Sequence, residues 1–534
     1  MKLELLMKIP ERRIDEGLAA YAQRLSELYS KTYSTEARKH RGQFFTPEQV
    51  SAFMVSLFGI PNKTIRLLDP GAGTGILTAA FCERLLNNGK TENLTIDVYE
   101  NDPNILPFLT MVLESCKSEL EYKGLVVEYN IYETDYVLHN KRYFTKSDLM
   151  WNGEKPVSYD FIISNPPYYK IDIESPQAIV MNELISGQPN IYALFMALSA
   201  SMLNADGEMV FITPRSFCSG LYYKKFRQWF LRKAQITNIH IFESRKEIFD
   251  QDEVLQENII IKAKKLKISE KPNKITISES KNKHFTNISK LEVRSEDVIF
   301  RKNGDIFIRI PTSPLDIEIL HVIDSWPNTL KELGLEISTG PVVSFRAEEY
   351  LLPELTEIPA SVPLLWMHNM KDMSIVSSIH KEKKASAIQV SSETKHLLLP
   401  VKNYVLVKRF SSKEQKRRLY ASVLLESEFP HKNVGIENHV NYIHKPGGNL
   451  SVIEAFGIAS LLNTTIIDKF FRSLNGNTQV NATDIRSLPL PDIENIRKIG
   501  KAVYESASYK NGIDLDGIIA GILGLNFEKQ SLNR

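Results

Sequence analysis

One stretch of the sequence decides the expected fold: Tyr159-Asp160-Phe161-Ile162-Ile163-Ser164-Asn165-Pro166-Pro167-Tyr168. Its first six residues form the apolar run that is typical of a buried β-strand. The two prolines that follow end the strand and stiffen the backbone beyond it. Since open α/β sheets bind their ligands at the carboxyl ends of strands, the stretch predicts an α/β protein with a site at this point.

The end of this stretch carries groups that suit a planar substrate with an amino group. The Asn165 Oδ1 atom and the Pro166 carbonyl can each accept one amino hydrogen, and the Tyr168 ring can stack on the substrate. The alternative is a plain turn that only ends a strand, which an Asn-Pro pair alone often forms. The second proline, the tyrosine and a glycine loop upstream favour the first interpretation.

That glycine loop is Leu67-Leu68-Asp69-Pro70-Gly71-Ala72-Gly73-Thr74-Gly75. The pattern predicts a strand over residues 65–68 and a helix over 74–86, with apolar residues at helical spacing. Three glycines between them allow a tight turn and a close approach of the backbone by a ligand. The spacing is not Gly-x-Gly-x-x-Gly, and no Gly-Lys-Ser/Thr follows, so it indicates neither a dinucleotide fingerprint nor a phosphate loop.

Carboxylates follow the next two expected strands. Glu100 comes after the strand predicted at 94–99, where an acidic side chain is placed to bind ribose hydroxyls. Asp135 follows the strand predicted at 125–132 and could accept a hydrogen bond from an adenine amino group. The alternatives are a solvated strand end for Glu100 and a surface turn for Asp135.

Strands and helices alternate up to about residue 265, which predicts a doubly wound parallel sheet. Two further strands, at 236–242 and 255–263, have no helix between them and predict an antiparallel pair. Residues rich in Lys, Ser, Asn and Thr follow, which indicates a linker or a poorly packed hairpin. The rest of the chain predicts a mixed α+β domain. The clearest helices are expected at residues 13–33, 190–203, 217–233 and 453–474.

The composition is that of an ordinary globular protein, with 43% apolar and 24% charged residues in a chain of 534, long enough for two or three domains. No window has the ~18 apolar residues of a membrane span. The first 13 residues lack the apolar run of a secretory signal. Three scattered cysteines indicate neither a disulfide framework nor a zinc site, so we expect a location in the reducing cytoplasm. They are Cys82, Cys116 and Cys218.

The net charge is only +2, but it is unevenly distributed. Residues 381–445 hold thirteen Lys and Arg against six Glu and no Asp. Such a patch is typical of a surface that binds phosphates, and the alternative is a solvated helix face. Phe410 and Tyr420 interleave with its densest part. The candidate DNA-binding residues are Lys408, Arg409, Lys416, Arg417 and Arg418.

The glycine loop followed by Asn165-Pro-Pro-Tyr resembles the S-adenosylmethionine-dependent amino-methyltransferases. Upstream, Gly42-Gln43-Phe44-Phe45-Thr46-Pro47 is similar to the first motif of the gamma-order DNA adenine-N6 enzymes. The resemblance implies a Rossmann-like methyltransferase sheet whose Phe45, Thr46 and Pro47 close over the methionine end of the cofactor. The implied S-adenosylmethionine-binding residues are Phe45, Thr46, Pro47, Asp69, Gly71, Gly73, Glu100, Asp135 and Asn165.

The second half narrows the resemblance. Ile337-Ser-Thr-Gly-Pro-Val-Val343 and Gly476-Asn-Thr-Gln-Val-Asn481 resemble restriction–modification methyltransferases of the Eco57I and PstI/BsuBI kind. Residues 254–259 are similar to the strand after the second aromatic of that group, which implies Phe249 as the partner of Tyr168 on the substrate base. Phe242 is a nearby competitor. The implied domains are a catalytic domain at 1–265, a linker or hairpin at 266–295 and a target recognition domain at 296–534.

The expected function is methylation of N6 of a flipped adenine in double-stranded DNA, without a metal, by a monomer. The resemblance implies a separately encoded endonuclease as the partner, a palindromic CTGCAG-like recognition site and a bacterial or archaeal cell. Three alternatives stay open. The first is an RNA or protein glutamine amino-methyltransferase, and the second is a methylase–nuclease fusion that uses the Glu-x-Lys spacing of Glu393-Thr394-Lys395. The third is a DNA-binding module with an inactive methylase fold.

Overall fold

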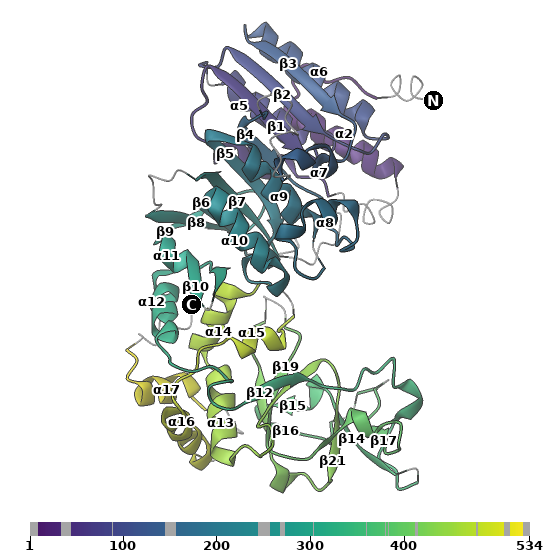
Figure 1. The fold of residues 1–534 in the computed structure, drawn as a ribbon, viewed down its shortest axis with the longest axis vertical. Coiled ribbons are helices and arrows are strands. Elements are labelled where there is room, and N and C mark those ends of the chain that lie inside the picture. The colour runs from purple at the N-terminus through teal and green to yellow at the C-terminus, as the bar shows by residue number, and fades with distance from the viewer. Residues whose placement is uncertain are drawn as a thin grey trace. The chain divides into compact units, whose positions relative to one another are not determined.

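The computed structural model describes residues 9–33, 44–87, 89–144, 156–188, 190–243, 257–266, 273–302, 304–358, 360–379, 381–382, 384–411, 415–476, 479–506 and 513–526. The chain divides into two compact units, Met1–Thr312 and Ser313–Arg534 (Figure 1). None of the helices in the described ranges is long and apolar enough to cross a membrane.

The first unit is built on a nine-stranded mixed sheet in the order β3-β2-β1-β4-β5-β7-β6-β8-β9. Strands β1 to β5 pair in parallel, and β7 runs antiparallel to both β5 and β6. The α/β fold and the antiparallel pair are thereby confirmed. The strands are β1 (Thr64–Pro70), β2 (Asn93–Tyr99), β3 (Val126–Tyr132), β4 (Tyr159–Ser164), β5 (Leu203–Pro214), β6 (Ala234–Phe242), β7 (Asn258–Lys265), β8 (Lys274–Ser280) and β9 (Ser289–Arg294).

The strand order reverses between β1 and β4. From β1 the chain builds outward through β2 and β3, and then returns to the other side of β1 with β4 and β5. The last four residues of β1 and of β4 are all buried, as expected for central strands that are covered on both faces. Ligands of such sheets bind outside the carboxyl ends of the strands at this switch point.

The helices of this unit form two packed groups. Helices α2, α4, α5 and α6 pack against one another, and α9 packs against α10. The longer helices are α2 (Leu18–Thr32), α4 (Glu48–Ser56), α5 (Ile76–Leu86), α6 (Leu106–Tyr122), α9 (Ile191–Met202) and α10 (Lys224–Lys233). The short elements are α7 (Tyr136–His139), α8 (Pro176–Val180), α11 (Ser295–Val298), η1 (Lys141–Tyr143), η3 (Asn182–Leu184), η4 (Arg215–Cys218) and η5 (Leu221–Tyr223).

The first unit extends beyond the boundary at 265 that the sequence suggested. Strands β8 and β9 form a hairpin, one of the two alternatives for this segment, and its first strand pairs in parallel with β6, so residues 274–294 belong to the sheet. A two-stranded ribbon, β10 (Ile299–Lys302) and β11 (Asp305–Ile308), completes the unit. The helix expected at 217–233 is also wrong in its first part, because the chain turns at Gly220 and only α10 is α-helical.

The second unit contains a six-stranded sheet and a five-stranded sheet. Their orders are β12-β22-β19-β20-β16-β15 and β13-β17-β14-β21-β18. Most of their pairs are antiparallel, which fits the expected α+β class. The strands are β12 (Glu336–Thr339), β13 (Leu351–Leu352), β14 (Ser361–Leu365), β15 (Met370–Lys371), β16 (Met373–Ile375), β17 (Ala387–Gln389), β18 (Leu398–Pro400), β19 (Tyr404–Lys408), β20 (Ala421–Leu424), β21 (Asn433–Ile436) and β22 (Val440–His444).

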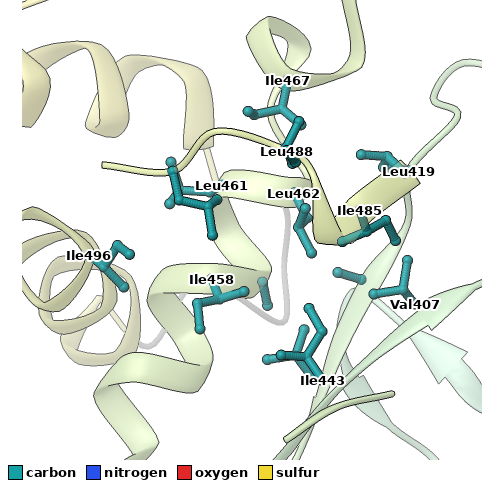
Figure 2. Packing of buried hydrophobic residues seen from close by; sticks show 14 of the residues in the cluster. Val407, Leu419, Ile443, Ile458, Leu461, Leu462, Ile467, Ile485, Leu488 and Ile496 are labelled. Atoms are coloured by element: carbon teal, nitrogen blue, oxygen red, sulfur yellow. The ribbon is translucent and has the colours of Figure 1, made fainter. Parts of the chain in front are cut away.

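The core of the second unit lies where its helices meet the six-stranded sheet. Figure 2 shows Ile458 and Leu462 of α13 lying between Ile496 of α16 and Val407 and Ile443 of the sheet. The helices are α12 (Pro314–Asp324), α13 (Val452–Leu462), α14 (Thr465–Leu474), α15 (Ala482–Arg486), α16 (Ile493–Glu505) and α17 (Leu515–Leu523). Short 3-10 turns are η6 (Glu348–Tyr350), η7 (Met367–Asn369), η8 (Lys395–Leu397) and η9 (Glu426–Glu428).

The single helix expected at 453–474 is two helices. Thr464 is the N-cap of α14, since its side chain accepts a hydrogen bond from the Ile467 amide. Asn463, one residue earlier, donates through Nδ2 to the Ala421 carbonyl and accepts from the Ala421 amide on β20. The apolar spacing continues through this break, so hydrophobic periodicity alone could not reveal it.

Candidate active site

A cavity of about 540 Å³ opens at the carboxyl ends of the first four strands of the sheet. The glycine loop, the ends of β2 and β3 and the segment after β4 all contribute to its wall. Seven of the predicted residues line it: Phe45, Thr46, Gly71, Gly73, Glu100, Asp135 and Asn165. Predicted residues from five separate segments of the chain therefore lie at one site.

The glycine loop has the backbone shape that only glycine adopts freely. Gly71, Gly73 and Gly75 have φ of +84°, +58° and +86°. The amides of Gly71 and Ala72 both donate to the Tyr99 carbonyl at 2.9 Å, which ties the loop to the end of β2. A Cβ atom at residue 75 would lie only 2.9 Å from the Leu109 Cδ1 atom. The glycines thus bring the start of α5 close to both β2 and α6.

Glu100 connects the glycine loop to the end of β2. Its Oε2 atom accepts from the Gly73 amide at 3.0 Å, and its Oε1 atom accepts from the Asp102 amide at 2.8 Å. Burial raises the pKa of Glu100, and these two backbone donors oppose that effect. Each carboxylate oxygen has a further lone pair, so Glu100 can hold the loop and still accept a hydrogen bond from a ligand.

Two residues that the sequence did not single out support this edge of the cavity. Asp102 lines it, and its Oδ2 atom accepts from the Tyr29 hydroxyl at 2.7 Å. The Tyr29 ring, on α2, meets Phe45 edge-on with a centroid distance of 5.7 Å. Three residues before Tyr29 in α2, the Ser26 hydroxyl lies 2.5 Å from the Thr74 hydroxyl in the glycine loop. Helix α2 therefore fixes both the loop and the Phe45 side of the cavity.

Asp69 lies behind the cavity wall rather than in it. Its side chain is fully buried at the end of β1, and its Oδ2 atom accepts from the Thr78 hydroxyl at 2.9 Å. No hydrogen-bond partner for its Oδ1 atom exists within the described part of the chain. Burial raises the pKa of Asp69 to about 7, while the Thr78 hydroxyl lowers it. Its predicted role at the cofactor stays a prediction, and the geometry gives it no direct access.

Asn165 is held in one orientation by three neighbours. Its Nδ2 atom donates to the Phe44 carbonyl at 2.7 Å and to the Thr46 hydroxyl at 3.1 Å. Since a carbonyl can only accept, the amide nitrogen must face Phe44, and Oδ1 then faces the Tyr168 hydroxyl at 2.7 Å. The Phe-Thr-Pro segment and the Asn-Pro-Pro-Tyr segment, far apart in sequence, therefore meet at this side chain.

Tyr168 is more buried than a plain stacking platform would be. Its side chain is 8% exposed, and its hydroxyl lies 2.8 Å from the Ile212 carbonyl as well as near Asn165. Its ring stacks on Phe44 at 5.6 Å, and Phe44 lines the cavity. Tyr168 and the buried Pro166 are not among the lining residues. Phe44 is thus an aromatic residue of the cavity wall for which the sequence predicted no role.

The proposed second aromatic cannot be located, because Phe249 lies outside the described residues. Its competitor Phe242 is 2% exposed within β6 and packs on His240 and Phe285, so it is a core residue. Asp135 lines the cavity, yet both its oxygens are engaged. Oδ1 caps α7 by accepting from the Leu138 amide at 2.8 Å, and Oδ2 accepts from Gln177 at 2.9 Å. Pro47 is the N-cap of α4 and does not line the cavity.

The candidate DNA-binding residues lie at the end of β19 and in the loop after it, not on a helix. Lys408 sits 3.7 Å over the Tyr420 ring, and burial together with the charge of Lys371 lowers its pKa. Arg409 donates to the Asn438 carbonyl at 3.0 Å. Lys416 is exposed and Arg417 is half-buried. All four can present positive charge at the surface of the second unit.

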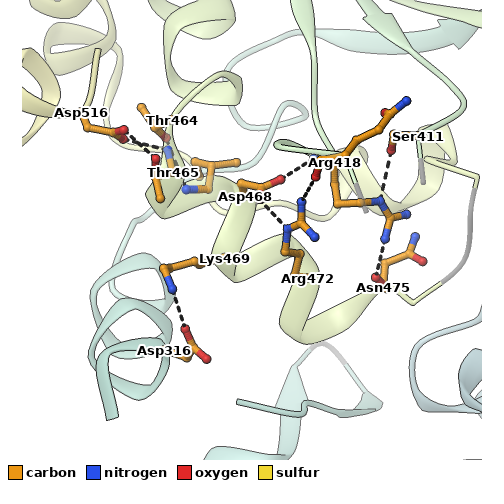
Figure 3. Close-up of polar contacts among 12 residues, drawn as sticks. Asp316, Ser411, Arg418, Thr464, Thr465, Asp468, Lys469, Arg472, Asn475 and Asp516 are labelled. Atoms are coloured by element: carbon orange, nitrogen blue, oxygen red, sulfur yellow. Dashed lines mark hydrogen bonds and ion pairs between the residues drawn. The ribbon is translucent and has the colours of Figure 1, made fainter. Parts of the chain in front are cut away.

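Arg418 does not fit its predicted role. Its side chain is 1% exposed, and its guanidinium donates to the Ser411 hydroxyl at 3.1 Å and to the Asn475 carbonyl at 3.2 Å. Figure 3 shows Arg418 surrounded by Ser411, Asn475 and Asp468, whose Oδ1 atom accepts from the Arg418 amide. A guanidinium enclosed in this way cannot reach a phosphate, so Arg418 is a structural residue.

The alternative nuclease site gains no support from this geometry. The Glu393 Oε1 atom accepts a hydrogen bond from the hydroxyl of its neighbour Ser392 at 2.7 Å, and the Thr394 side chain next to it is buried. No group of three His, Cys, Asp or Glu side chains suited to a metal occurs in the ranges that the structure describes.

The cavity wall offers two kinds of group. Three carboxylates line it, from Glu100, Asp102 and Asp135, and so do Asn165 and the aromatic Phe44. The carboxylates suit hydroxyl and amino groups, since a carboxylate only accepts hydrogen bonds. Asn165 and Phe44 suit a planar group that needs one acceptor and a stacking surface.

The chain resembles known proteins over most of its length. The family model of the Eco57I restriction-modification methylase matches residues 78–249. Type II methyltransferase M.PstI of Providencia stuartii is 35% identical over 479 residues, covering 90% of this chain and 92% of the relative. Type II methyltransferase M.BsuBI of Bacillus subtilis is 35% identical over 491 residues, covering 90% and 94%. Among solved structures, the type IIG restriction endonuclease BpuSI is 14% identical with a TM-score of 0.44, covering 97% of this chain and 67% of that chain.

Proposed function

Because the chain belongs to the type II methyltransferases of restriction–modification, the family that includes M.PstI and M.BsuBI, we propose that it methylates DNA. The reaction we propose moves a methyl group from S-adenosylmethionine to N6 of an adenine flipped out of the duplex. The observation that carries the proposal is the fixed amide of Asn165, which stands in the cavity wall beside Phe44.

The cavity fits S-adenosylmethionine in size and in polarity. Its volume of about 540 Å³ lies within the range of small-molecule sites. Gly71 and Gly73 let the backbone approach a ligand, and Glu100 has acceptor capacity left for ribose hydroxyls. Phe45 and Thr46 would cover the methionine end. S-adenosylmethionine would supply an electrophilic methyl group, and Asp135 would reach the adenine ring of the cofactor.

Asn165 would activate the target nitrogen by accepting a hydrogen bond from it through Oδ1. The lone pair of an exocyclic adenine nitrogen is delocalised into the ring, so the nitrogen is a weak nucleophile. An acceptor at Asn165 Oδ1 and another at the Pro166 carbonyl favour a pyramidal nitrogen with a localised lone pair. These acceptors bind more strongly as positive charge develops on the nitrogen, and they therefore lower the barrier rather than only binding the substrate.

Tyr168 would serve this chemistry mainly as a positioning residue. Its one hydroxyl proton lies between two acceptors, Asn165 Oδ1 and the Ile212 carbonyl, at 2.7 and 2.8 Å. Asn165 Oδ1 keeps a lone pair for the substrate, and Tyr168 limits the directions in which it points. Phe44, whose ring lines the cavity in front of Tyr168, would then be the surface on which the flipped base lies.

The second unit would select the DNA sequence, with Lys408, Arg409, Lys416 and Arg417 as phosphate contacts. Phosphate contacts position a protein on DNA, whereas base contacts specify the sequence. A separately encoded endonuclease that cuts the same sequence would be the natural partner of such an enzyme.

The test is transfer of a labelled methyl group from S-adenosylmethionine, with DNA, RNA and protein offered separately. We expect label only in DNA, recovered as N6-methyladenine, and the modified positions can be read by single-molecule sequencing. Asn165→Ala should abolish transfer and leave cofactor binding nearly unchanged. Asn204→Ala is a matched control, because Asn204 lies near the amino end of β5 and bonds Asp160. Transfer to RNA or protein alone, or full activity of Asn165→Ala, would contradict the proposal.

A further inference from the structure

The turn after β5 exposes two large hydrophobic side chains next to each other. Leu221 is 60% exposed and Tyr222 is 55% exposed, and they form the one consecutive pair among the exposed large hydrophobics of the described residues. Both belong to η5, which follows the carboxyl end of β5. Exposed apolar side chains scattered singly need no explanation, but an adjacent pair at the binding edge of a sheet does.

The turn that carries this pair is held by a buried arginine. Arg227 is fully buried beneath it and donates to the carbonyls of Phe217 and Gly220 at 3.0 and 2.7 Å. The same guanidinium is paired with Asp305 at 3.1 Å. A Cβ atom at Gly187 would collide with the Tyr222 ring, so this ring lies against the neighbouring loop. Because the backbone of the turn is held by these hydrogen bonds, its side chains can insert into a partner while the backbone keeps its conformation.

The pair is linked to the active site by a chain of aromatic rings. Tyr168 meets Tyr192 edge-on at 6.3 Å, and Tyr192 stacks on Tyr223 of η5 at 5.7 Å. The Tyr192 hydroxyl also lies 2.8 Å from that of Ser216 in the same turn. Two ring-to-ring steps thus separate the Asn-Pro-Pro-Tyr motif from the turn that exposes Leu221 and Tyr222.

The segment that carries the pair is cationic, which suits a polyanion as the partner. Residues 209–242 contain six Lys and Arg and no Asp or Glu. Arg215 and Arg227 are buried, but Lys225 is exposed and Lys224 is half-buried, and both follow the pair after Tyr223. Apolar side chains flanked by cations suit double-stranded DNA, where the stacked bases are apolar and the backbone is anionic.

We propose that Leu221 and Tyr222 enter the base stack of the DNA and fill the space that the target adenine leaves when it is flipped. Leucine and aromatic side chains inserted between base steps are a known way to unstack a duplex, and flipping a paired base costs a few kcal/mol. The pair would offset part of that cost. This inference rests on the proposed function and assigns a new role to a turn outside the cavity.

The experiment measures methyl transfer to a duplex that contains the mapped target site, with the target adenine either paired or opposite an abasic position. The abasic partner removes most of the pairing that flipping must break. The Leu221→Ala/Tyr222→Ala double variant should lose roughly tenfold in kcat/KM relative to the wild type on the paired duplex, the change that 1.4 kcal/mol produces. On the abasic duplex the kcat/KM of the double variant divided by that of the wild type should be close to one. Tyr222→Phe keeps the ring and should behave as the wild type on both.

Tyr122→Ala is the matched control for loss of an exposed aromatic. Tyr122 is 85% exposed at the end of α6, just before the amino end of β3, and its loss should leave both ratios unchanged. If the double variant loses the same factor in kcat/KM on both duplexes, the pair has a merely structural role. If it loses nothing on the paired duplex, the pair takes no part in base flipping. Either result overturns the inference while the wild-type activity on DNA stands. A wild type that methylates no DNA would instead overturn the proposed function, and this inference with it.

Discussion

Asp69→Asn should change the pH dependence of folding. The Asp69 carboxyl is fully buried at the end of β1, and burial raises its pKa to about 7 from 3.8. Below pH 3.8 both the folded and the unfolded chain hold this proton, so the ionisation of the carboxyl does not lower the free energy of unfolding. Between 3.8 and about 7 the unfolded chain releases the proton while the folded chain keeps it, so the free energy of unfolding falls.

The size of this effect follows from the two pKa values. A difference from 3.8 to about 7 corresponds to ~4 kcal/mol of stability lost in the wild type by pH 8, as an upper limit. Asparagine cannot ionise, so the free energy of unfolding of Asp69→Asn minus that of the wild type should rise between pH 4 and 7 and then level off. The amide would keep an acceptor for the Thr78 hydroxyl, which limits the structural disturbance.

Urea unfolding at a series of pH values between 4.5 and 8, followed for the variant and the wild type together, measures this difference. Using the difference between the two proteins cancels the titration of the other carboxylates. Asp15→Asn, at an exposed position, controls for the removal of one carboxylate from the surface. A difference in unfolding free energy that stays constant from pH 4.5 to 8 would refute the argument, and Asp69 would then be ionised in the folded protein over the whole range.

Three further changes test the remaining assignments. Glu100→Gln should weaken S-adenosylmethionine binding in calorimetry, because the ribose loses an anionic acceptor, and unchanged affinity would leave Glu100 only as the residue that holds the glycine loop. Replacing Lys416 and Arg417 together by Ala should weaken binding to cognate and scrambled duplexes alike and reduce the slope of log affinity against log salt by up to roughly 0.9 for each phosphate that is no longer neutralised. An unchanged slope would move DNA docking elsewhere on the chain. Arg418→Ala should instead lower the free energy of unfolding by about 2–3 kcal/mol, since it leaves buried acceptors at Ser411 and Asn475 unpaired, and a stable variant with weakened DNA binding would restore its predicted role.

The sheet and the position of the site could be predicted because they follow from local patterns. Apolar strand runs, the glycine loop and the Asn-Pro-Pro-Tyr turn each report on a few consecutive residues, and parallel strands bring their carboxyl ends to one edge. Seven predicted residues line a single cavity for that reason. Asp69 and Pro47 do not, because sequence proximity to a ligand-binding turn does not say which side chains face the ligand.

What the sequence could not predict depends on contacts between distant segments. Arg418 belongs to a basic run, yet its burial is decided by Asp468 and Asn475, some fifty residues later in the chain. The break between α13 and α14 is decided in the same way, by the bonds of Asn463 to β20. For residues 274–294 the composition left a linker and a hairpin open, and the pairing of β8 with β6 decides for a hairpin within the sheet. In each case the contacts that decide the structure come from segments far away in the sequence.

The Asn-Pro-Pro-Tyr motif is itself dependent on distant segments, which explains why it is more than a strand-ending turn. Its amide nitrogen is bonded to Phe44 and Thr46, more than a hundred residues earlier, and its tyrosine reaches Ile212 at the end of β5. A substrate acceptor must point in one direction to stabilise developing charge, and a free asparagine side chain would rotate. Residues 44–46 therefore do two things at once, since they line the cavity and hold the orientation of the group that would meet the target nitrogen. Loss of either segment should consequently reduce the rate of transfer even where the cavity and the glycine loop remain intact.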